Sequence, residues 1–267
     1  MLNRKKILNS KKISCVIPTH KRDEYLEEAI NSVIKQTQLP LEIVVSNNAP
    51  NEETKKVVNR IALKSTIPIN YIEHNMKGKG PISYNLAASK SKGDYIAFLD
   101  DDDLWEPHYL EKMSIFINHR CSEITYSWFN KLKNNQKTPY KKLKENLKIK
   151  DFLLRNPGST ISNLIVEKDI FIGLGGFDDY INPSYDKDFL MRAIYFGYKY
   201  HVLEENLVTQ RKHSNEQLTD INKEFLIGIK KFFKKHELHA SLVIKIKFWI
   251  KFLRMLIKLF NLKKNKI

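Results

Sequence analysis

Four consecutive aspartates, Asp100 to Asp103, directly follow the apolar run at 95–99. Carboxylates this close together repel one another and raise one another's pKa unless a cation neutralises them. Loops that offer only oxygen ligands suit Mg²⁺ or Mn²⁺, which take their remaining ligands from water and substrate phosphates. The cluster therefore predicts a divalent-metal site, and the alternatives are a solvated acidic turn and a Ca²⁺ loop.

A glycine-containing stretch at 75–81 is a second candidate for ligand binding. It joins an expected strand to an expected helix, and Gly78 and Gly80 could let backbone N–H groups approach a phosphate. Ser83 stands where the dinucleotide fingerprint needs its third glycine, and no G-K-[ST] follows. Phosphate binding and an ordinary turn therefore both remain open for this loop.

The elements that position these residues alternate along the first hundred residues. Short apolar runs predict strands at 13–17, 41–45, 69–72 and 95–99, and helical spacing predicts helices at 23–35, 52–63 and 82–89. Such alternation predicts an α/β fold with a largely parallel sheet covered by helices. Ligands of these sheets bind outside the carboxyl ends of the strands, where this chain places polar residues at 19–22, 46–48, 75–80 and 100–103.

The later part of the chain is less regular. We expect a helix at 107–118, strands at 124–129 and 162–166, a turn-rich loop at 173–179 and a helix at 186–196. The Lys/Asn-rich stretch at 131–150 predicts a mobile surface loop.

Six segments together resemble the inverting family 2 glycosyltransferases of the type-A, nucleotide-diphospho-sugar transferase fold. Residues 13–22 and 42–48 are similar to the first two strands of the family, and 75–85 to its N-x-G-x-x-x-A-R-N segment. Residues 93–103 resemble G-[DE]-Y-I-x-F-L-D-x-D-D, 175–178 the G-G-F-D loop, and 185–192 the E-D-x-[DE]-x-x-x-R helix start. The resemblance spans about 13–213 and implies hexose transfer from a nucleotide-diphospho-sugar, with a UDP-sugar as the expected donor.

The resemblance also implies roles for individual residues. Asp100 and Asp102 would hold Mn²⁺ or Mg²⁺ and Asp186 would be the catalytic base. Arg211 and His213 fall where the family often has a residue that contacts the diphosphate or the metal. The residues implied to bind the nucleotide or the donor sugar are Pro18, Thr19, His20, Arg22, Asn48, Gly78, Asp101, Asp103 and Arg211.

Three positions depart from the family pattern. Asn47 and Asn48 replace an acidic pair, which leaves the nucleotide base open. Tyr84 stands where an Arg often precedes Asn85, and Tyr185 where an acid is common.

The chemistry of such a site follows from charge. A bound metal stabilises the negative charge that develops on the leaving diphosphate, while a carboxylate removes the proton of the acceptor hydroxyl. A single in-line displacement of this kind inverts the anomeric centre. Asp188 is the alternative base, although two residues further along a helix it should point elsewhere.

Composition bounds the remaining possibilities. A chain of 267 residues that is 42% hydrophobic can bury a large core. Its two cysteines, Cys15 and Cys121, are not spaced as metal ligands are, and they do not indicate a disulfide framework. We expect a protein of the cytoplasm, since the basic start has no apolar run typical of a signal peptide. The net charge is +16, of which residues 221–267 carry +11.

That basic segment predicts a separate tail at 221–267, after a catalytic domain at 1–220. Within 242–260 the cations Lys247, Lys251, Arg254 and Lys258 recur at helical spacing among apolar residues. We expect an amphipathic helix that holds the enzyme on the inner face of the cell membrane through anionic lipid, with Phe248 and Trp249 inserted. A helix packed on the catalytic domain is the alternative.

A membrane-bound transferase suggests a glycan or lipid-linked acceptor in the synthesis of a bacterial surface polysaccharide such as an O-antigen or a capsule. Two other classes of protein agree with parts of the sequence. A nucleic-acid-binding protein would suit the charge but leaves the aspartates unexplained, so we expect no specific nucleic-acid partner. A sugar-nucleotide nucleotidyltransferase usually has a glycine-rich run after its first strand, which residues 18–22 lack.

Overall fold

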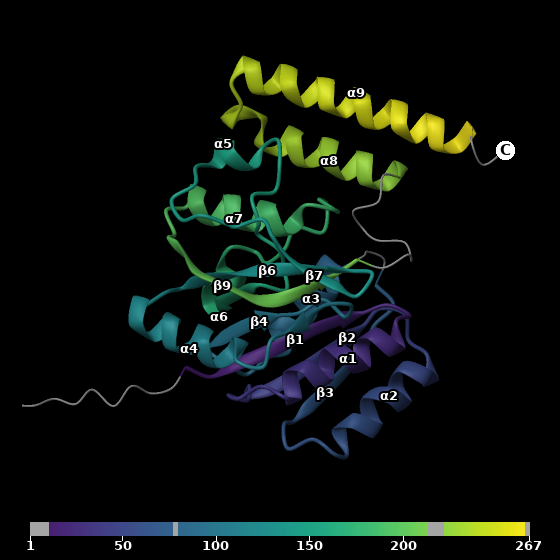
Figure 1. The fold of residues 1–267 in the computed structure, drawn as a ribbon, viewed down its shortest axis with the longest axis vertical. Coiled ribbons are helices and arrows are strands. Elements are labelled where there is room, and N and C mark those ends of the chain that lie inside the picture. The colour runs from purple at the N-terminus through teal and green to yellow at the C-terminus, as the bar shows by residue number, and fades with distance from the viewer. Residues whose placement is uncertain (1–10, 77–79, 213–221, 265–267) are drawn as a thin grey trace, which may run out of the picture.

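The computed structural model describes residues 11–76, 80–212 and 222–264, with side chains to residue 261. Its first half alternates strands and helices as predicted (Figure 1). These elements are β1 (Ile13–Thr19), α1 (Asp23–Ile34), β2 (Glu42–Asn47), α2 (Glu52–Ala62), β3 (Ile69–Glu73), α3 (Pro81–Lys90) and β4 (Tyr95–Phe98).

The second half adds strands of both directions and the tail helices. The strands are β5 (Leu104–Trp105), β6 (Ile124–Lys133), β7 (Gln136–Tyr140), β8 (Leu164–Glu167) and β9 (Tyr200–Arg211). The helices are α4 (Tyr109–Arg120), α5 (Ile149–Phe152), α6 (Lys168–Gly173), α7 (Tyr185–Tyr195), α8 (Lys223–His236), the 3₁₀ helix η1 (Glu237–His239) and α9 (Leu242–Lys264).

One sheet joins both halves in the order β3-β2-β1-β4-β8-β6-β9-β5, and β7 pairs with β6. The first four strands are parallel, which confirms the predicted α/β class. Beyond β4 the sheet is mixed, because β8 is antiparallel to both β4 and β6, and β9 is parallel to β6. The start of β8 and the ends of β4 and β9 consequently lie at the same edge of the sheet.

Part of the stretch at 131–150, which was predicted to be a mobile surface loop, is instead a β-hairpin: residues 131–140 belong to β6, its turn and β7, whereas residues 141–148 are irregular. Strand β6 continues to Lys133, and a two-residue turn leads into β7, with Lys133 paired to Gln136. The turn residues Asn134 and Asn135 both have positive φ, as a type I′ hairpin requires. Further along the stretch, Leu143 is fully buried.

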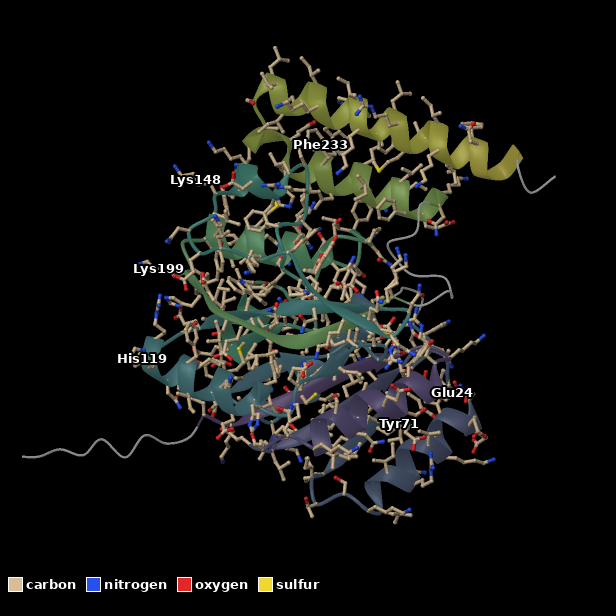
Figure 2. The ribbon with its side chains drawn as sticks, viewed as in Figure 1. Glu24, Tyr71, His119, Lys148, Lys199 and Phe233 are labelled. Carbon is tan, nitrogen blue, oxygen red and sulfur yellow. The ribbon has the colours of Figure 1, made fainter. Side chains whose placement is uncertain are left out.

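The tail helices α8 and α9 pack on the catalytic domain. The predicted alternative, a helix packed on that domain, therefore holds for one face of α9. Phe232, Phe233 and Phe248 belong to the same hydrophobic cluster as Phe98 and Phe177 near the sheet. Phe233 lies between α8 and α9 and stacks on Phe248 with ring centroids 3.7 Å apart (Figure 2). The expectation that Phe248 inserts into a membrane is therefore wrong, because this ring is buried within the protein.

Candidate active site

The predicted metal site is formed by the carboxylates that follow β4. Oxygen atoms of Asp100, Asp102 and Asp103 lie within 4.8 Å of one another. Burial and then the charge of Asp102 raise the pKa of Asp100 to about 7. The same two causes raise the pKa of Asp103 well above its usual range. Carboxylates that are crowded and insufficiently neutralised fit a divalent cation, and Asp103 joins the predicted pair in this group.

Asp101 points away from this group and holds the turn that follows β1. Its Oδ2 accepts a hydrogen bond from Thr19 Oγ1 at 2.8 Å, and its Oδ1 accepts one from Arg22 Nη1 at 3.1 Å. Arg22 Nη1 also lies 2.8 Å from Asp102 Oδ2. Burial, followed by the charge of Asp102, raises the pKa of Asp101 to about 6. Arg22 thus links the turn after β1 to Asp102, one of the three aspartates of the predicted metal site.

Ser162, at the start of β8, connects two of the aspartates. Its hydroxyl lies 2.6 Å from Asp103 Oδ2 and 3.3 Å from Asp100 Oδ2, and with one hydrogen it donates to only one of them at a time. The backbone N–H of Asp100 donates to the same hydroxyl oxygen at 3.1 Å, and that of Arg211 donates to Asp103 Oδ1 at 3.0 Å. Tyr84, which is fully buried, donates its hydroxyl hydrogen to Asp100 Oδ1.

Two aspartates near the start of α7 have different surroundings. Asp186 Oδ2 accepts from Asn156 Nδ2 at 3.1 Å, and burial raises the pKa of its carboxyl. Asp188 is fully buried and lies 2.8 Å from Arg192 Nε and 2.7 Å from His236 Nε2. Lys235 Nζ is a further partner, 2.9 Å from Asp188 Oδ1.

These partners change the acidity of Asp188. Although burial alone would raise its pKa, the hydrogen bond from His236 and the charge of Arg192 lower that pKa to about 2. Asp188 therefore joins α7 to α8 through its contacts with Lys235 and His236.

A cavity of about 470 Å³ connects the functional groups. Asp100, Asp102 and Asp103 line one part of it, and Asp186 lines another. Other parts of the lining come from the β6–β7 hairpin and from α8 and α9, through Lys131, Tyr140, Phe225, Ile229, Phe232, Phe248 and Met255. The three aspartates of the predicted metal site and the predicted base Asp186 thus line the same cavity, which α8 and α9 help to enclose.

The predicted nucleotide-binding residues fall into two groups. Arg22 and Arg211 line the cavity, whereas Pro18, Thr19, His20 and Asn48 lie at the ends of β1 and β2 outside its described lining. His20 Nδ1 lies 2.6 Å from Asn48 Oδ1, so these two strand ends are joined. Gly78 and His213 lie outside the described residues.

Sequence reasoning missed Ser162, Asn156 and the lysine that follows Asp186. Ser162 precedes an antiparallel strand, and the strand signal alone gave no direction for that strand. Asn156 lies in an irregular segment with no periodic pattern. Tyr84 was noticed only as a departure from the family. Because a helix of this fold runs antiparallel to the strand that follows it, the first turns of α3 lie beside the end of β4, and Tyr84 meets Asp100 there.

The comparisons with known proteins agree with this geometry. The family model described as Glycosyl transferase family 2 matches residues 14–166. This chain belongs to glycosyltransferase family 2. The transferase is 28% identical over 211 residues to an uncharacterized glycosyltransferase of Methanocaldococcus jannaschii, covering 74% of this chain and 70% of the relative.

Solved structures share the type-A fold with this transferase. The Staphylococcus aureus enzyme TarS, residues 1–349 with UDP-GlcNAc, superposes with a TM-score of 0.69 at 20% identity, covering 91% of this chain and 72% of that one. A Pyrobaculum calidifontis mannosyltransferase with GDP-Man and Mn²⁺ has a TM-score of 0.59 at 15% identity, covering 76% and 57%.

By sequence, the match to TarS is restricted to part of both proteins. TarS is described as a poly(ribitol-phosphate) beta-N-acetylglucosaminyltransferase, and 27% identity extends over 115 residues. These residues are 42% of this chain and 20% of TarS.

Proposed function

We propose that this glycosyltransferase moves a hexose from a UDP-sugar to a glycan or lipid-linked acceptor in bacterial surface polysaccharide synthesis, with inversion at the anomeric carbon. The observation that carries the proposal is that the aspartate group after β4 and Asp186 face one cavity. The structural likeness to TarS with UDP-GlcNAc, and the beta-N-acetylglucosaminyltransferase activity in the name of TarS, support a UDP-sugar donor and an inverting reaction.

Asp100, Asp102 and Asp103 would hold Mn²⁺ or Mg²⁺, and His213 remains a proposed further ligand. When bound, the metal stabilises negative charge on the leaving diphosphate. The likeness to a mannosyltransferase bound to Mn²⁺ supports this cofactor. Arg211 and Gly78 would contact the diphosphate, and the residues at the ends of β1 and β2 would bind the nucleoside.

Asp186 would accept the proton of the acceptor hydroxyl. Its Oδ2 is oriented by Asn156, and Oδ1 accepts the backbone N–H of Lys187 at 2.7 Å. Because burial raises the pKa of this carboxyl, it binds a proton more readily than an exposed aspartate does. Asp188, which already pairs with Arg192, Lys235 and His236, is poorly suited to the same task.

Calorimetry of UDP binding tests the metal-dependent donor site. UDP should bind tightly with Mn²⁺ and weakly in EDTA, and Asp102→Ala should remove the difference. Asp179→Ala is the matched control, since Asp179 is exposed and does not line the cavity. Equal UDP affinity with and without Mn²⁺ in the wild-type protein would refute the metal role.

We also propose that α9 binds the inner face of the cell membrane. None of the helices in the described part of the chain is sufficiently long and apolar to span a bilayer. One face of α9 nevertheless exposes about half or more of each apolar side chain, namely Leu242, Val243, Ile246, Trp249, Ile250, Leu253, Ile257 and Phe260. Lys247, Arg254 and Lys258 are exposed on the same helix. An apolar face flanked by cations favours a surface of anionic lipid.

Vesicle flotation tests the membrane proposal. The double variant Leu253→Glu/Ile257→Glu should lose binding to phosphatidylglycerol vesicles and stay folded, because both side chains point outward. Leu63→Glu/Ile172→Glu, at exposed apolar positions elsewhere, is the control. Equal flotation of the two variants would contradict the proposal.

A further inference from the structure

Five lysines line the cavity, and the proposed reaction uses none of them. We propose that Lys141, Lys187 and Lys251 form a binding site for a phosphate group of the acceptor, next to Asp186. This inference rests on the proposed function and specifies the acceptor as a phosphate-bearing molecule. The lysines come from distant segments, after β7, from α7 and from α9, and all three line the cavity.

Lys187 is the buried member of this lysine site. Its side chain lies in the protein interior, and Nζ is 3.7 Å from the centroid of the Phe232 ring on α8. Among the described residues, no carboxylate forms a salt bridge with this ammonium group. A buried lysine in that position needs an anionic partner when charged.

The other two lysines bring further positive charge to the same place. Lys251 Nζ donates to the carbonyl oxygen of Leu154 at 2.6 Å, which holds α9 over the cavity. Burial and then the nearby charges lower the pKa of Lys187 to about 7, against the opposing effect of Asp186, and Lys251 and Lys141 are among those charges. The positive charges of the three lysines thus oppose one another.

The local carboxylates do not balance this charge. Asp186 has the stronger influence on Lys187, while Asp188 already has Arg192, Lys235 and His236 as partners. Three ammonium groups beside one available carboxylate favour a ligand with more than one negative charge, and lysine is a common phosphate ligand. A phosphate held there would place an adjoining hydroxyl or phosphate oxygen of the acceptor near Asp186.

Charged and neutral probes test this site in the full-length protein saturated with UDP and Mn²⁺. Glycerol 3-phosphate should bind the wild type in calorimetry, whereas glycerol should not. The double variant Lys141→Gln/Lys251→Gln should weaken glycerol 3-phosphate binding at least about tenfold and leave UDP affinity unchanged. Lys187 is not varied, because its replacement could prevent folding.

The matched control is Lys144→Gln/Lys234→Gln, which removes the same charge from exposed positions outside the cavity lining. Equal weakening in both double variants, no binding to the wild type, or displacement of UDP by glycerol 3-phosphate would overturn the inference. Failure of UDP itself to bind would instead refute the proposed function. Farnesyl phosphate distinguishes the source of the phosphate: tighter binding than glycerol 3-phosphate indicates a lipid, and weaker binding indicates a polyol phosphate.

Discussion

Two buried acidic sites in this molecule differ in how they are neutralised. Asp188 has the cations Arg192 and Lys235 and the imidazole of His236 within 3 Å and a pKa of about 2, whereas Asp100 has the charge of Asp102 beside it and a pKa of about 7. Burial acts on both, so the partners cause the difference. A carboxylate whose charge is already balanced joins elements of the fold, and a group whose charge is not balanced is available to bind a cation.

The largest expected effect is on catalysis, and it distinguishes Asp186 from Asp188 on the same helix α7. Asp186→Asn should lower kcat by about 10²- to 10⁴-fold, because the amide keeps the shape of the side chain but cannot accept the proton. UDP affinity should remain nearly unchanged. Steady-state kinetics on a verified acceptor measures both values. A variant with nearly wild-type kcat, together with an inactive but folded Asp188→Asn protein, would assign the base to Asp188.

Asp188→Asn should chiefly affect stability. Removing the charge leaves Arg192, Lys235 and His236 gathered around a neutral amide, and breaking a buried pair of this kind costs about 3–5 kcal/mol. Urea unfolding measures the loss of free energy. Asp178→Asn, which removes a more exposed partner of Lys235, serves as the control and should cost less. Equal losses in the two variants would contradict the structural role of Asp188.

The same site predicts a pH dependence. Because the folded-state pKa of Asp188 is about 2, below its unfolded value, its stabilisation is fully present above about pH 4 and is lost as the pH falls towards 2. The stability difference between the wild type and Asp188→Asn should therefore shrink by roughly 2 kcal/mol over that range. Unfolding curves at several pH values measure it, and a constant difference would count against this assignment.

Tyr84→Phe should have the smallest effect of these substitutions. It tests how the ionisation of Asp100 affects the predicted metal site. The Tyr84 hydroxyl stabilises the ionised form of Asp100, so its removal should raise the pKa of Asp100 and weaken Mn²⁺ binding near neutral pH. The expected loss is about tenfold, the value of one hydrogen bond to a charged group. Mn²⁺ titrations at pH 6 and pH 8 should show a larger loss at the lower pH. The same loss at both would exclude an effect through Asp100 ionisation.

Much of the first half of the fold could be predicted because its contacts follow from strand direction. Parallel strands end at one edge, so the residues after β1, β2 and β4 meet there, and Asp101 indeed bonds to Thr19 and Arg22. The hairpin at 131–150 was missed because its outer strand is exposed and polar and lacks the alternation that marks a half-buried strand. The adjacent asparagines of its turn were the available signal.

The supporting residues of the site were less accessible to sequence analysis. Ser162 reaches Asp103 across 59 positions of the chain, and His236 reaches Asp188 across 48. Neither pairing has a local pattern, because each depends on how an antiparallel strand or a terminal helix is placed. The tail was recognised as amphipathic, but periodicity alone does not state which of its faces meets protein.

The link between Asp188 and His236 has a consequence for biosynthesis. The ribosome must add 48 further residues after Asp188 before His236 exists. At about 5–20 residues per second, this takes roughly 2–10 s. During that interval the nascent helix α7 carries a carboxylate whose partners on α8 have not been made. The end of α7 that carries Asp188 is therefore expected to become fixed only after α8 has been made, by which time strands β1 to β9 have already been synthesised.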